Sequence, residues 1–365
     1  MNVRLVALGA LAVLAACGGE KKTGAAGEAA PGGAAAPAAS SSGGADLTGA
    51  GSSFAYPIYS KWAAEYAAKT GVKVNYQSIG SSGGIRQLSD EIVDFGASDG
   101  PMTDDQMAQA KGGPILHFPT VLGGVSITYN LAEVKQPLRL TGPVLADIYL
   151  GTITKWNDPR ITALNPGVTL PKEDIVVVHR SDGSGTTYIF TDYLSAVSPA
   201  WAKGPGKAQT INWPVGLGGK GSEGVTGQVK QTPGAIGYVE LSYASQNHLP
   251  SALIKNADGE WVTPTLQSVT DAAAGAVQAL PANTDYRISI VNAKGKTSYP
   301  ISSFTWILVY QHPTDAVKTQ KLKDFLTWAY QNGESAAGSL DYAPLPASMS
   351  AALVKRLDEI TVASK

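Results

Sequence analysis

The sequence contains almost no cysteine: the only one among 365 residues is Cys17. The chain that follows it therefore needs neither disulfide bonds nor a reducing compartment. Histidine is also scarce, with four residues at positions 117, 179, 248 and 312, and they form no His-rich metal-binding motif. We therefore expect the protein to use no metal ion and no cofactor.

Charge is scarce as well. Charged residues make up 16% of the chain, and the formal net charge is −1. No basic field marks the sequence as a binder of nucleic acid or of an anionic membrane surface. Glycine is abundant instead, with 41 residues, which indicates many tight turns or close approaches of the backbone to a ligand.

The apolar run near the N-terminus is too short to span a membrane. It covers only residues 5–16, whereas a spanning helix needs about 20 residues. Residues 1–16 therefore indicate a secretion signal. The run ends in Leu14-Ala15-Ala16-Cys17-Gly18, which resembles the bacterial lipobox, in which the cysteine is acylated. The alternative is an ordinary signal peptide with a chance cysteine. We expect a cell-envelope protein, in the periplasm or on the outer face of a membrane, anchored through a lipid on Cys17.

Residues 18–45 consist mostly of Gly, Ala, Ser and Pro. They contain no aromatic residue and no aliphatic residue larger than alanine, so they cannot bury enough apolar surface to fold. A flexible chain of this length reaches on the order of 30 Å. We interpret residues 17–45 as a lipidated cysteine followed by a disordered tether.

The rest of the chain alternates between strand-like and helix-like segments, which is typical of an α/β fold with a parallel or mixed sheet. The main strands are expected at residues 72–76, 115–121, 125–129, 174–180, 235–240, 286–291 and 301–310. The main helices are expected at residues 56–69, 143–150, 186–197 and 314–331.

Three turns rich in Gly and Ser lie at or near the starts of predicted helices. They are "GAGSSF" (residues 49–54), "GSSGG" (residues 80–84) and "HRSDGSGTTYIF" (residues 179–190). Helix N-termini expose unpaired N–H groups and carry positive partial charge, so together such turns could surround one tetrahedral oxyanion. The alternative for each turn alone is plain helix capping, because serine and threonine are common N-cap residues.

Two other interpretations of these turns are weaker. None of them carries the Gly-Lys-Ser/Thr of a Walker phosphate loop. A nucleophile elbow at Ser184 would need glycine at positions 182 and 186, which are Asp182 and Thr186. A secreted hydrolase using Ser184, His179 and Asp182 remains an alternative function, because the three residue types lie close together in the sequence.

Two charged side chains complete the candidate site. Arg180 could bind an anion through its fork of donors, and Asp182 could hold that guanidinium in place. A surface ion pair is the alternative. Asp99 precedes Gly100-Pro101 and could be a simple turn cap. A carboxylate only accepts hydrogen bonds, so facing a ligand it would favour an oxyanion that still carries a proton, such as phosphate, over sulfate.

Several stretches in order along the chain closely resemble the periplasmic phosphate-binding proteins of bacterial high-affinity ABC phosphate transporters. The resemblance runs from about Leu47 to the C-terminal helix and leaves out the tether. The stretches are "GAGSSFAYPIYSKW", "VNYQSIGSSGGIRQL", "VDFGASDGPMTD", "LADIYLGTITKWNDP", "VVHRSDGSGTTYIFTDYL", "GLGGKGSEGV", "PGAIGYVE" and "FLTWAYQNG".

The resemblance implies a set of phosphate ligands, position by position. They are Ser53, Phe54, Ser81, Asp99, Arg180, Ser184, Gly185 and Thr186, with Ser52 contributing through its backbone. Asp99 would accept the proton of the phosphate, and Asp182 would pair with Arg180. Ser53 stands where the most familiar members have threonine. Serine keeps the hydroxyl and lacks the methyl group. His179 would be structural.

The resemblance also implies a non-enzymatic, two-lobed binding protein of periplasmic type II, with the ligand cleft between the lobes. Lobe one would comprise residues 46–123 and 300–365, and lobe two residues 124–299. Two hinge crossings are expected near residues 122–125 and 298–301. The partners would be inorganic phosphate and the permease and ATPase complex of the transporter, with the binding protein itself a monomer. Arsenate and sulfate are the alternative anions.

Overall fold

The computed structural model describes residues 47–278, 280–281 and 284–363. The predicted signal segment, Cys17 and the predicted tether lie outside these residues. Within them, no helix combines the length and the apolar character that a membrane crossing requires.

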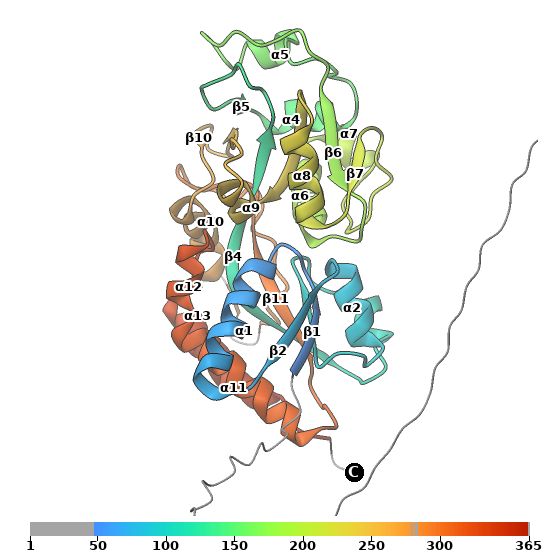
Figure 1. Cartoon of the computed structure of the whole chain (residues 1–365), viewed down its shortest axis with the longest axis vertical. Coiled ribbons are helices and arrows are strands. Elements are labelled where there is room, and N and C mark those ends of the chain that lie inside the picture. The colour runs from blue at the N-terminus through green and yellow to red at the C-terminus, as the bar shows by residue number, and fades with distance from the viewer. Residues whose placement is uncertain (1–46, 279, 282–283, 364–365) are drawn as a thin grey trace, which may run out of the picture. The chain divides into compact units, whose positions relative to one another are not determined.

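One eight-stranded mixed sheet organises the described chain (Figure 1). In spatial order its strands are β2 (Val74–Ser78), β1 (Leu47–Gly51), β3 (Phe95–Ser98), β11 (Ser302–Tyr310), β4 (Ile115–Tyr129), β8 (Ala235–Glu240), β6 (Val176–Arg180) and β7 (Leu217–Gly219). A second sheet contains β10 (Trp261–Val262), β9 (Leu253–Lys255) and β5 (Arg139–Leu140). Parallel pairs lie toward both edges of the large sheet, and antiparallel pairs join them in its middle.

The described residues also form helices, several of which pack against the large sheet. They are α1 (Tyr56–Thr70), α2 (Ser81–Ser89), α3 (Asp104–Ala108), α4 (Gly142–Tyr149), α5 (Pro159–Thr162), α6 (Gly185–Val197), α7 (Pro199–Lys203), α8 (Gly221–Gln231), α9 (Leu241–Gln246), α10 (Leu266–Gln278), α11 (Ala316–Asn332), α12 (Glu334–Ser339) and α13 (Ala347–Arg356), with a 3₁₀ turn at Leu357–Glu359. Helix α1 shows why they form where they do: Pro57 stands in its first turn, left-handed Gly71 ends it, and a stripe including Tyr59 and Trp62 is buried.

The long strand β4 links two groups of elements. Its residues 115–124 pair with β11, and its residues 125–129 pair with β8. Figure 1 shows α1, α2 and α11 around β1 and β2, whereas α6 and α8 lie around β6 and β7. The change of partner falls at Gly124 and Val125, within the first predicted hinge crossing. The N–H of Val125 donates to the carbonyl of Ile301, which stands at the second.

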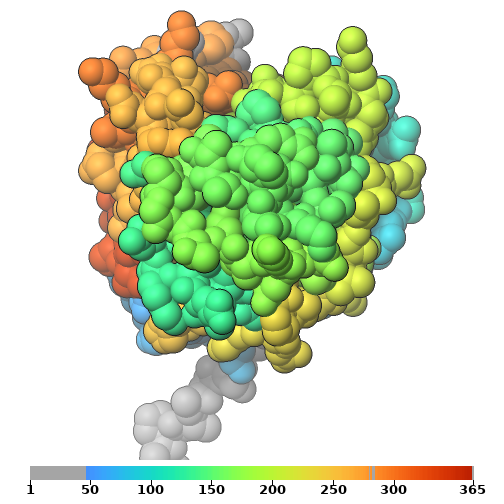
Figure 2. Space-filling view, turned by 90° about the horizontal axis from the view of Figure 1, so that it is seen from above, coloured from blue at the N-terminus to red at the C-terminus, as the bar shows by residue number. Residues whose placement is uncertain are grey.

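Segments distant in sequence share the face drawn in Figure 2. Residues between about 130 and 190 occupy its centre, those between about 250 and 300 lie on one side, and those between about 200 and 230 on the other. This gathering of residues is consistent with a second lobe made from the middle of the chain, although its boundaries stay a prediction.

The predicted α/β class and most predicted elements are confirmed. The two strands expected at residues 115–121 and 125–129 form one continuous strand, β4. The Gly123-Gly124 pair lies inside this strand and does not end it. A Cβ on Gly123 would clash with the ring of Phe54, so glycine at this position allows close packing.

The strand expected at residues 286–291 is wrong. This segment is irregular. Tyr286 has a positive φ of 60°, and the N–H of Ile288 donates to the carbonyl of Tyr286, so the backbone turns instead of extending. Tyr286 and Ile290 are buried in the main core although their segment does not pair in a sheet.

Candidate anion-binding site

The second and third Gly/Ser turns meet directly. The hydroxyl oxygen of Ser81 accepts a hydrogen bond from the N–H of Gly185 at 3.0 Å. The N–H of Ser82 donates to the carbonyl oxygen of Gly183 at 3.1 Å. A Cβ on Gly185 would lie 2.5 Å from both the Ser81 hydroxyl and a carboxylate oxygen of Asp99, so only glycine allows this approach. The fold therefore brings together two turns about a hundred residues apart.

Asp99 lies at the centre of this cluster and is 1% exposed. Its Oδ1 accepts hydrogen bonds from the hydroxyls of Ser52, at 2.5 Å, and Thr305, at 2.7 Å. Its Oδ2 faces the Ser81 hydroxyl at 3.4 Å. Asp99 is therefore not a simple turn cap. Sequence reasoning missed Thr305, whose only signal is a hydroxyl inside the apolar strand β11.

Burial raises the pKa of Asp99 to about 6. The hydrogen bonds from Ser52 and Thr305 and the positive charge of Arg180 all act in the opposite direction, because each favours the ionised carboxylate. At neutral pH Asp99 is thus mostly a buried carboxylate that can accept one more hydrogen bond.

Arg180 forms a two-point ion pair with Asp182. Its Nε and Nη2 donate to the two carboxylate oxygens at 2.7 and 2.6 Å, and its side chain is almost fully buried. Burial acts to raise the pKa of Asp182, but the hydrogen bonds and charge of Arg180, with the N–H of Gly221, bring that pKa below its usual range. Nη1 of Arg180 lies 3.4 Å from the Thr186 hydroxyl. This is a buried pair and not a surface one, and it confirms the predicted contact between Arg180 and Asp182.

Three tyrosine hydroxyls fix the first turn. Tyr76, Tyr243 and Tyr342 donate to the carbonyl oxygens of Ser52, Ser53 and Phe54 respectively, at 2.8, 2.7 and 2.5 Å. Within the described residues the backbone N–H groups of Ser53 and Phe54 form no protein hydrogen bond. Buried N–H groups are almost always paired, so these two are candidates for donation to a bound anion.

Ser53 also contacts the start of α8. The hydroxyl oxygens of Ser53 and Ser222 lie 3.1 Å apart. The backbone N–H of Ser222 donates to the hydroxyl oxygen of Ser53, also at 3.1 Å. Ser222 was not among the predicted ligands, although it lies in the stretch "GLGGKGSEGV" that carries part of the resemblance. A third helix start therefore reaches the site.

Only one of the serines is an N-cap residue, although the Ser52 hydroxyl accepts the N–H of Ala55, just before α1, at 3.0 Å. Ser184 is the N-cap of α6, and its hydroxyl accepts the N–H of Thr187 at 3.1 Å. The N-cap residues of α1 and α2 are Ala55 and Gly80. Neither residue caps its helix through a side-chain hydrogen bond. The hydroxyls of Ser53 and Ser81 instead point into the cluster.

The structure buries all the predicted ligands. None of the following side chains is more than 3% exposed: Ser52, Ser53, Phe54, Ser81, Asp99, Arg180, Ser184 and Thr186; Gly185 is buried as well. The residues come from the ends of β1, β3 and β6 and the starts of α2 and α6. Their assignment as phosphate ligands stays a prediction.

The arrangement does not support the hydrolase alternative. Nδ1 of His179 lies 3.0 Å from the carbonyl oxygen of Arg180, and its ring stacks on Trp213 with centroids 4.8 Å apart. Burial lowers the pKa of His179. Ser184 and Asp182 are engaged with Thr187 and Arg180, and among the described residues neither side chain bonds to His179. A nucleophile, its base and an orienting acid are thus not connected.

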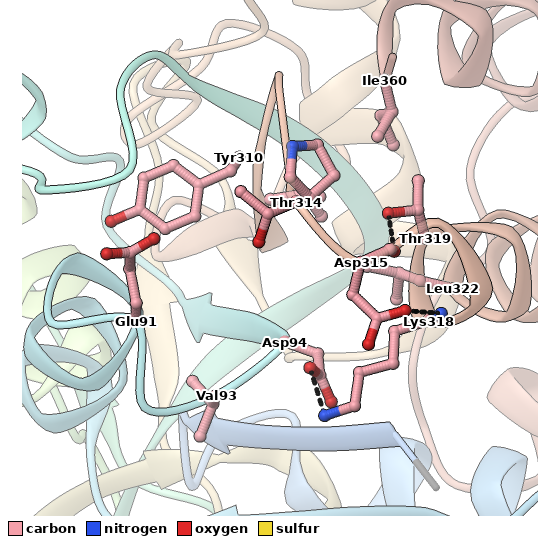
Figure 3. Close-up of a pocket in the computed structure, with 12 residues that line it drawn as sticks. Glu91, Val93, Asp94, Tyr310, Thr314, Asp315, Lys318, Thr319, Leu322 and Ile360 are labelled. Carbon is pink, nitrogen blue, oxygen red and sulfur yellow. Dashed lines mark hydrogen bonds and ion pairs between the residues drawn. The ribbon is translucent and has the colours of Figure 1, made fainter. Parts of the chain in front are cut away.

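A separate pocket between β11, α11 and the segment just before β3 has the wrong charges for an anion (Figure 3). Glu91, Asp94 and Asp315 are the acids among its lining residues. Its Lys318 is engaged with Asp94 at 3.0 Å. None of the predicted ligands lines it. Within residues 47–278, 280–281 and 284–363 no cluster of side chains is suited to a metal ion.

Comparisons with known proteins agree with this architecture. The family model of the PBP superfamily domain matches residues 36–332. The phosphate-binding protein PstS of Xylella fastidiosa strain 9a5c is 45% identical over 313 residues, covering 86% of this chain and 84% of that protein. PstS of Pasteurella multocida is 47% identical over 301 residues, covering 82% and 86%.

Solved structures share the fold at lower identity. A phosphate ABC transporter substrate-binding protein from Clostridium perfringens, with bound phosphate, is 18% identical with a TM-score of 0.61, covering 83% of this chain and all of that one. The periplasmic phosphate-binding protein PfluDING, also with phosphate, is 21% identical with a TM-score of 0.65, covering 84% and 92%.

The matched length and the large mixed sheet define a protein of the PBP superfamily with the type II fold, as the sequence predicts. Within that superfamily the chain belongs to the family of the phosphate-binding protein PstS.

Proposed function

We propose that this protein binds inorganic phosphate with high affinity and delivers it to the permease of an ABC transporter. The relatives of more than 40% identity are phosphate-binding proteins by name. The single observation that carries the proposal is the position of Asp99, a buried carboxylate that accepts hydrogen bonds from Ser52 and Thr305 and faces the starts of α2 and α6 at Ser81 and Gly185.

Most groups of the proposed site are donors. The N–H groups of Ser53 and Phe54, the hydroxyls of the turns and the Arg180 guanidinium would face the phosphate oxygens. Hydrogen bonds to a charged group contribute about 1.5–3 kcal/mol each. After the costs of desolvation and closure, several of them support a dissociation constant in the micromolar range or below.

Asp99 gives the site its selectivity. As an acceptor it would take the proton that phosphate retains at neutral pH, whereas sulfate has no proton to offer and would be repelled. The pairing of Arg180 with Asp182 damps the positive charge that would otherwise attract any anion. Arsenate has the same shape and protonation as phosphate, so it is the anion expected to compete.

Closure of two lobes around the ligand is part of the proposal. Lobe one would contain residues 46–123 and 300–365, lobe two residues 124–299. The change of strand partner at Gly124 and Val125, next to Ile301, supports hinges at residues 122–125 and 298–301. The contacts between Ser81 and Gly185 and between Ser53 and Ser222 would then join the lobes.

The protein would act in the cell envelope as a monomer without enzymatic activity. A lipid on Cys17 and the tether of residues 17–45 would hold it at a membrane, within reach of the permease and ATPase complex. Labelling with a radioactive fatty acid tests the anchor: we expect incorporation in the wild type and none in Cys17→Ser.

Calorimetry on phosphate-free protein tests the site. We expect binding of phosphate and arsenate, and weakening by at least tenfold in Ser184→Ala, which loses one hydroxyl at the site. Ser195→Ala, a serine later in the same helix, is the control and should bind like the wild type. Unchanged phosphate affinity in Ser184→Ala would refute the assignment of this turn.

A further inference from the structure

Gln209 contacts one proposed ligand, Ser184, and the chain neighbours of two others, without being a ligand itself. Its backbone carbonyl oxygen accepts the N–H of Ser184 at 2.8 Å. Its side-chain Oε1 accepts the hydroxyl of Ser82 at 2.7 Å, and its Nε2 donates to the hydroxyl oxygen of Ser98 at 3.3 Å. Ser82 follows Ser81 in the chain, and Ser98 precedes Asp99.

The amide of glutamine suits both contacts. The hydroxyl proton of Ser98 is committed to the carbonyl of Gly100 at 2.5 Å, so its oxygen is left to accept from Nε2. Ser82 has a hydroxyl proton to donate, which Oε1 accepts. An amide supplies one acceptor and one donor side by side, which neither a carboxylate nor an aliphatic side chain can do.

These contacts cross the proposed cleft. Ser82 and Ser98 belong to the first proposed lobe, whereas Gln209 lies in the second, in the segment between α7 and β7. Gln209 also borders a pocket lined by Arg180, Asp182 and Trp213, at the edge of the ligand cluster. Its side chain is therefore partly accessible, unlike the buried ligands.

We propose that Gln209 is a positioning residue that holds the closed cleft and sets the rate of phosphate release. This inference rests on the proposed function, because it requires phosphate to be bound between two lobes. Its two side-chain hydrogen bonds can form only after the lobes meet. They would therefore slow dissociation and leave the first encounter with phosphate unchanged.

Gln209→Met tests this role because methionine matches the length of glutamine and has no amide. Dissociation is followed by loading the protein with radioactive phosphate and adding excess unlabelled phosphate. Two neutral hydrogen bonds correspond to roughly a tenfold change in an equilibrium constant. We expect the dissociation rate to rise about tenfold, the dissociation constant by the same factor, and the association rate, their ratio, to stay unchanged.

Ser82→Ala removes one of the two bonds from the opposite side. It should raise the dissociation rate by a smaller factor, and adding it to Gln209→Met should have almost no further effect, because the two changes share one bond. This variant also replaces Gln209→Met if that protein does not fold. Asn212→Ala is the matched control: Asn212 lines the same pocket, and within the described residues its side chain forms no hydrogen bond.

The outcomes separate the two proposals. A wild type that retains no radioactive phosphate would refute the proposed function itself. A wild type that binds phosphate, with dissociation rates in Gln209→Met and Ser82→Ala equal to that of Asn212→Ala, would overturn the role of Gln209. A weaker Gln209→Met complex whose loss lies wholly in the association rate would overturn it too.

Discussion

The hydroxyl of Thr305 donates a 2.7 Å hydrogen bond to Oδ1 of Asp99, although the two residues lie 206 positions apart. Strand β11, which carries Thr305, pairs with β3 just before Asp99, with Trp306 opposite Ser98. A carboxylate with both oxygens otherwise free could turn toward several partners. This bond and the one from Ser52 occupy Oδ1, which leaves Oδ2 as the oxygen that faces the turns of Ser81 and Gly185.

Removing the Thr305 hydroxyl should raise the pKa of Asp99 further. The hydrogen bond favours the ionised carboxylate, so in Thr305→Val the pKa should lie above the wild-type value of about 6. Phosphate affinity can be measured by calorimetry between pH 8 and pH 5. As the pH is lowered, the affinity of Thr305→Val should begin to fall at a higher pH than that of the wild type, because its Asp99 is protonated earlier. Thr305→Ser keeps the hydroxyl and should follow the wild-type curve; identical curves for all three proteins would contradict the role of Thr305.

The buried carboxylate should make stability depend on pH. The pKa of Asp99 is raised from 3.8 to about 6 in the folded protein, so the native state holds more protons than the unfolded state in this window. The contribution of Asp99 to the free energy of unfolding is therefore complete below pH 3.8 and is lost as the pH rises through 6. The loss is about 3 kcal/mol, at about 1.4 kcal/mol for each pH unit of the window.

Urea unfolding of phosphate-free wild type and Asp99→Asn measures this contribution. Asparagine does not titrate, so the stability of Asp99→Asn relative to the wild type should increase from pH 4 to pH 7 by most of that amount. A constant difference between the two proteins over this range would mean that Asp99 titrates normally.

Asp99→Asn should also relax selectivity. The amide of asparagine can donate to a fully ionised oxyanion, so sulfate binding should strengthen by at least tenfold while phosphate binding weakens. Competition of sulfate against radioactive phosphate measures both changes. In the wild type, sulfate should compete better at pH 5 than at pH 8, because protonated Asp99 can donate as well. Sulfate competition that is the same in both proteins and at both pH values would show that Asp99 does not select the anion.

Gly185→Ala should nearly abolish binding. Its methyl group would fall 2.5 Å from Asp99 and from Ser81, so the two turns would have to separate. We expect a loss of at least a hundredfold in phosphate affinity. Gly227→Ala, inside α8, is the control, because a Cβ there meets no atom within 4 Å. Alanine favours a helix by up to about 1 kcal/mol over glycine, so the control should melt at the same or a higher temperature and bind normally.

Local sequence signals were sufficient for the parts of the site held by a single turn. The contact of Arg180 with Asp182 and the capping of α6 by Ser184 depend on neighbours in the chain, and both were visible in the sequence. The type II fold followed from the resemblance, and the α/β class from the alternation of segments.

Contacts between distant segments could not be read in this way. Thr305, Ser222 and Gln209 reach the site only because β11, α8 and the segment before β7 fold against it. Each is an ordinary polar residue in its own local sequence. The incorrect prediction of a strand at residues 286–291 has the same origin. Apolar spacing alone does not show whether a neighbouring strand is available for pairing.

Calorimetric titration of the phosphate-free wild type with phosphate and with sulfate at pH 8 tests the central claim most directly. Asp99 is ionised at that pH, so phosphate should bind at one site with a dissociation constant in the micromolar range or below, and sulfate should give no measurable binding. Equal binding of the two anions, or no binding of phosphate, would contradict the account.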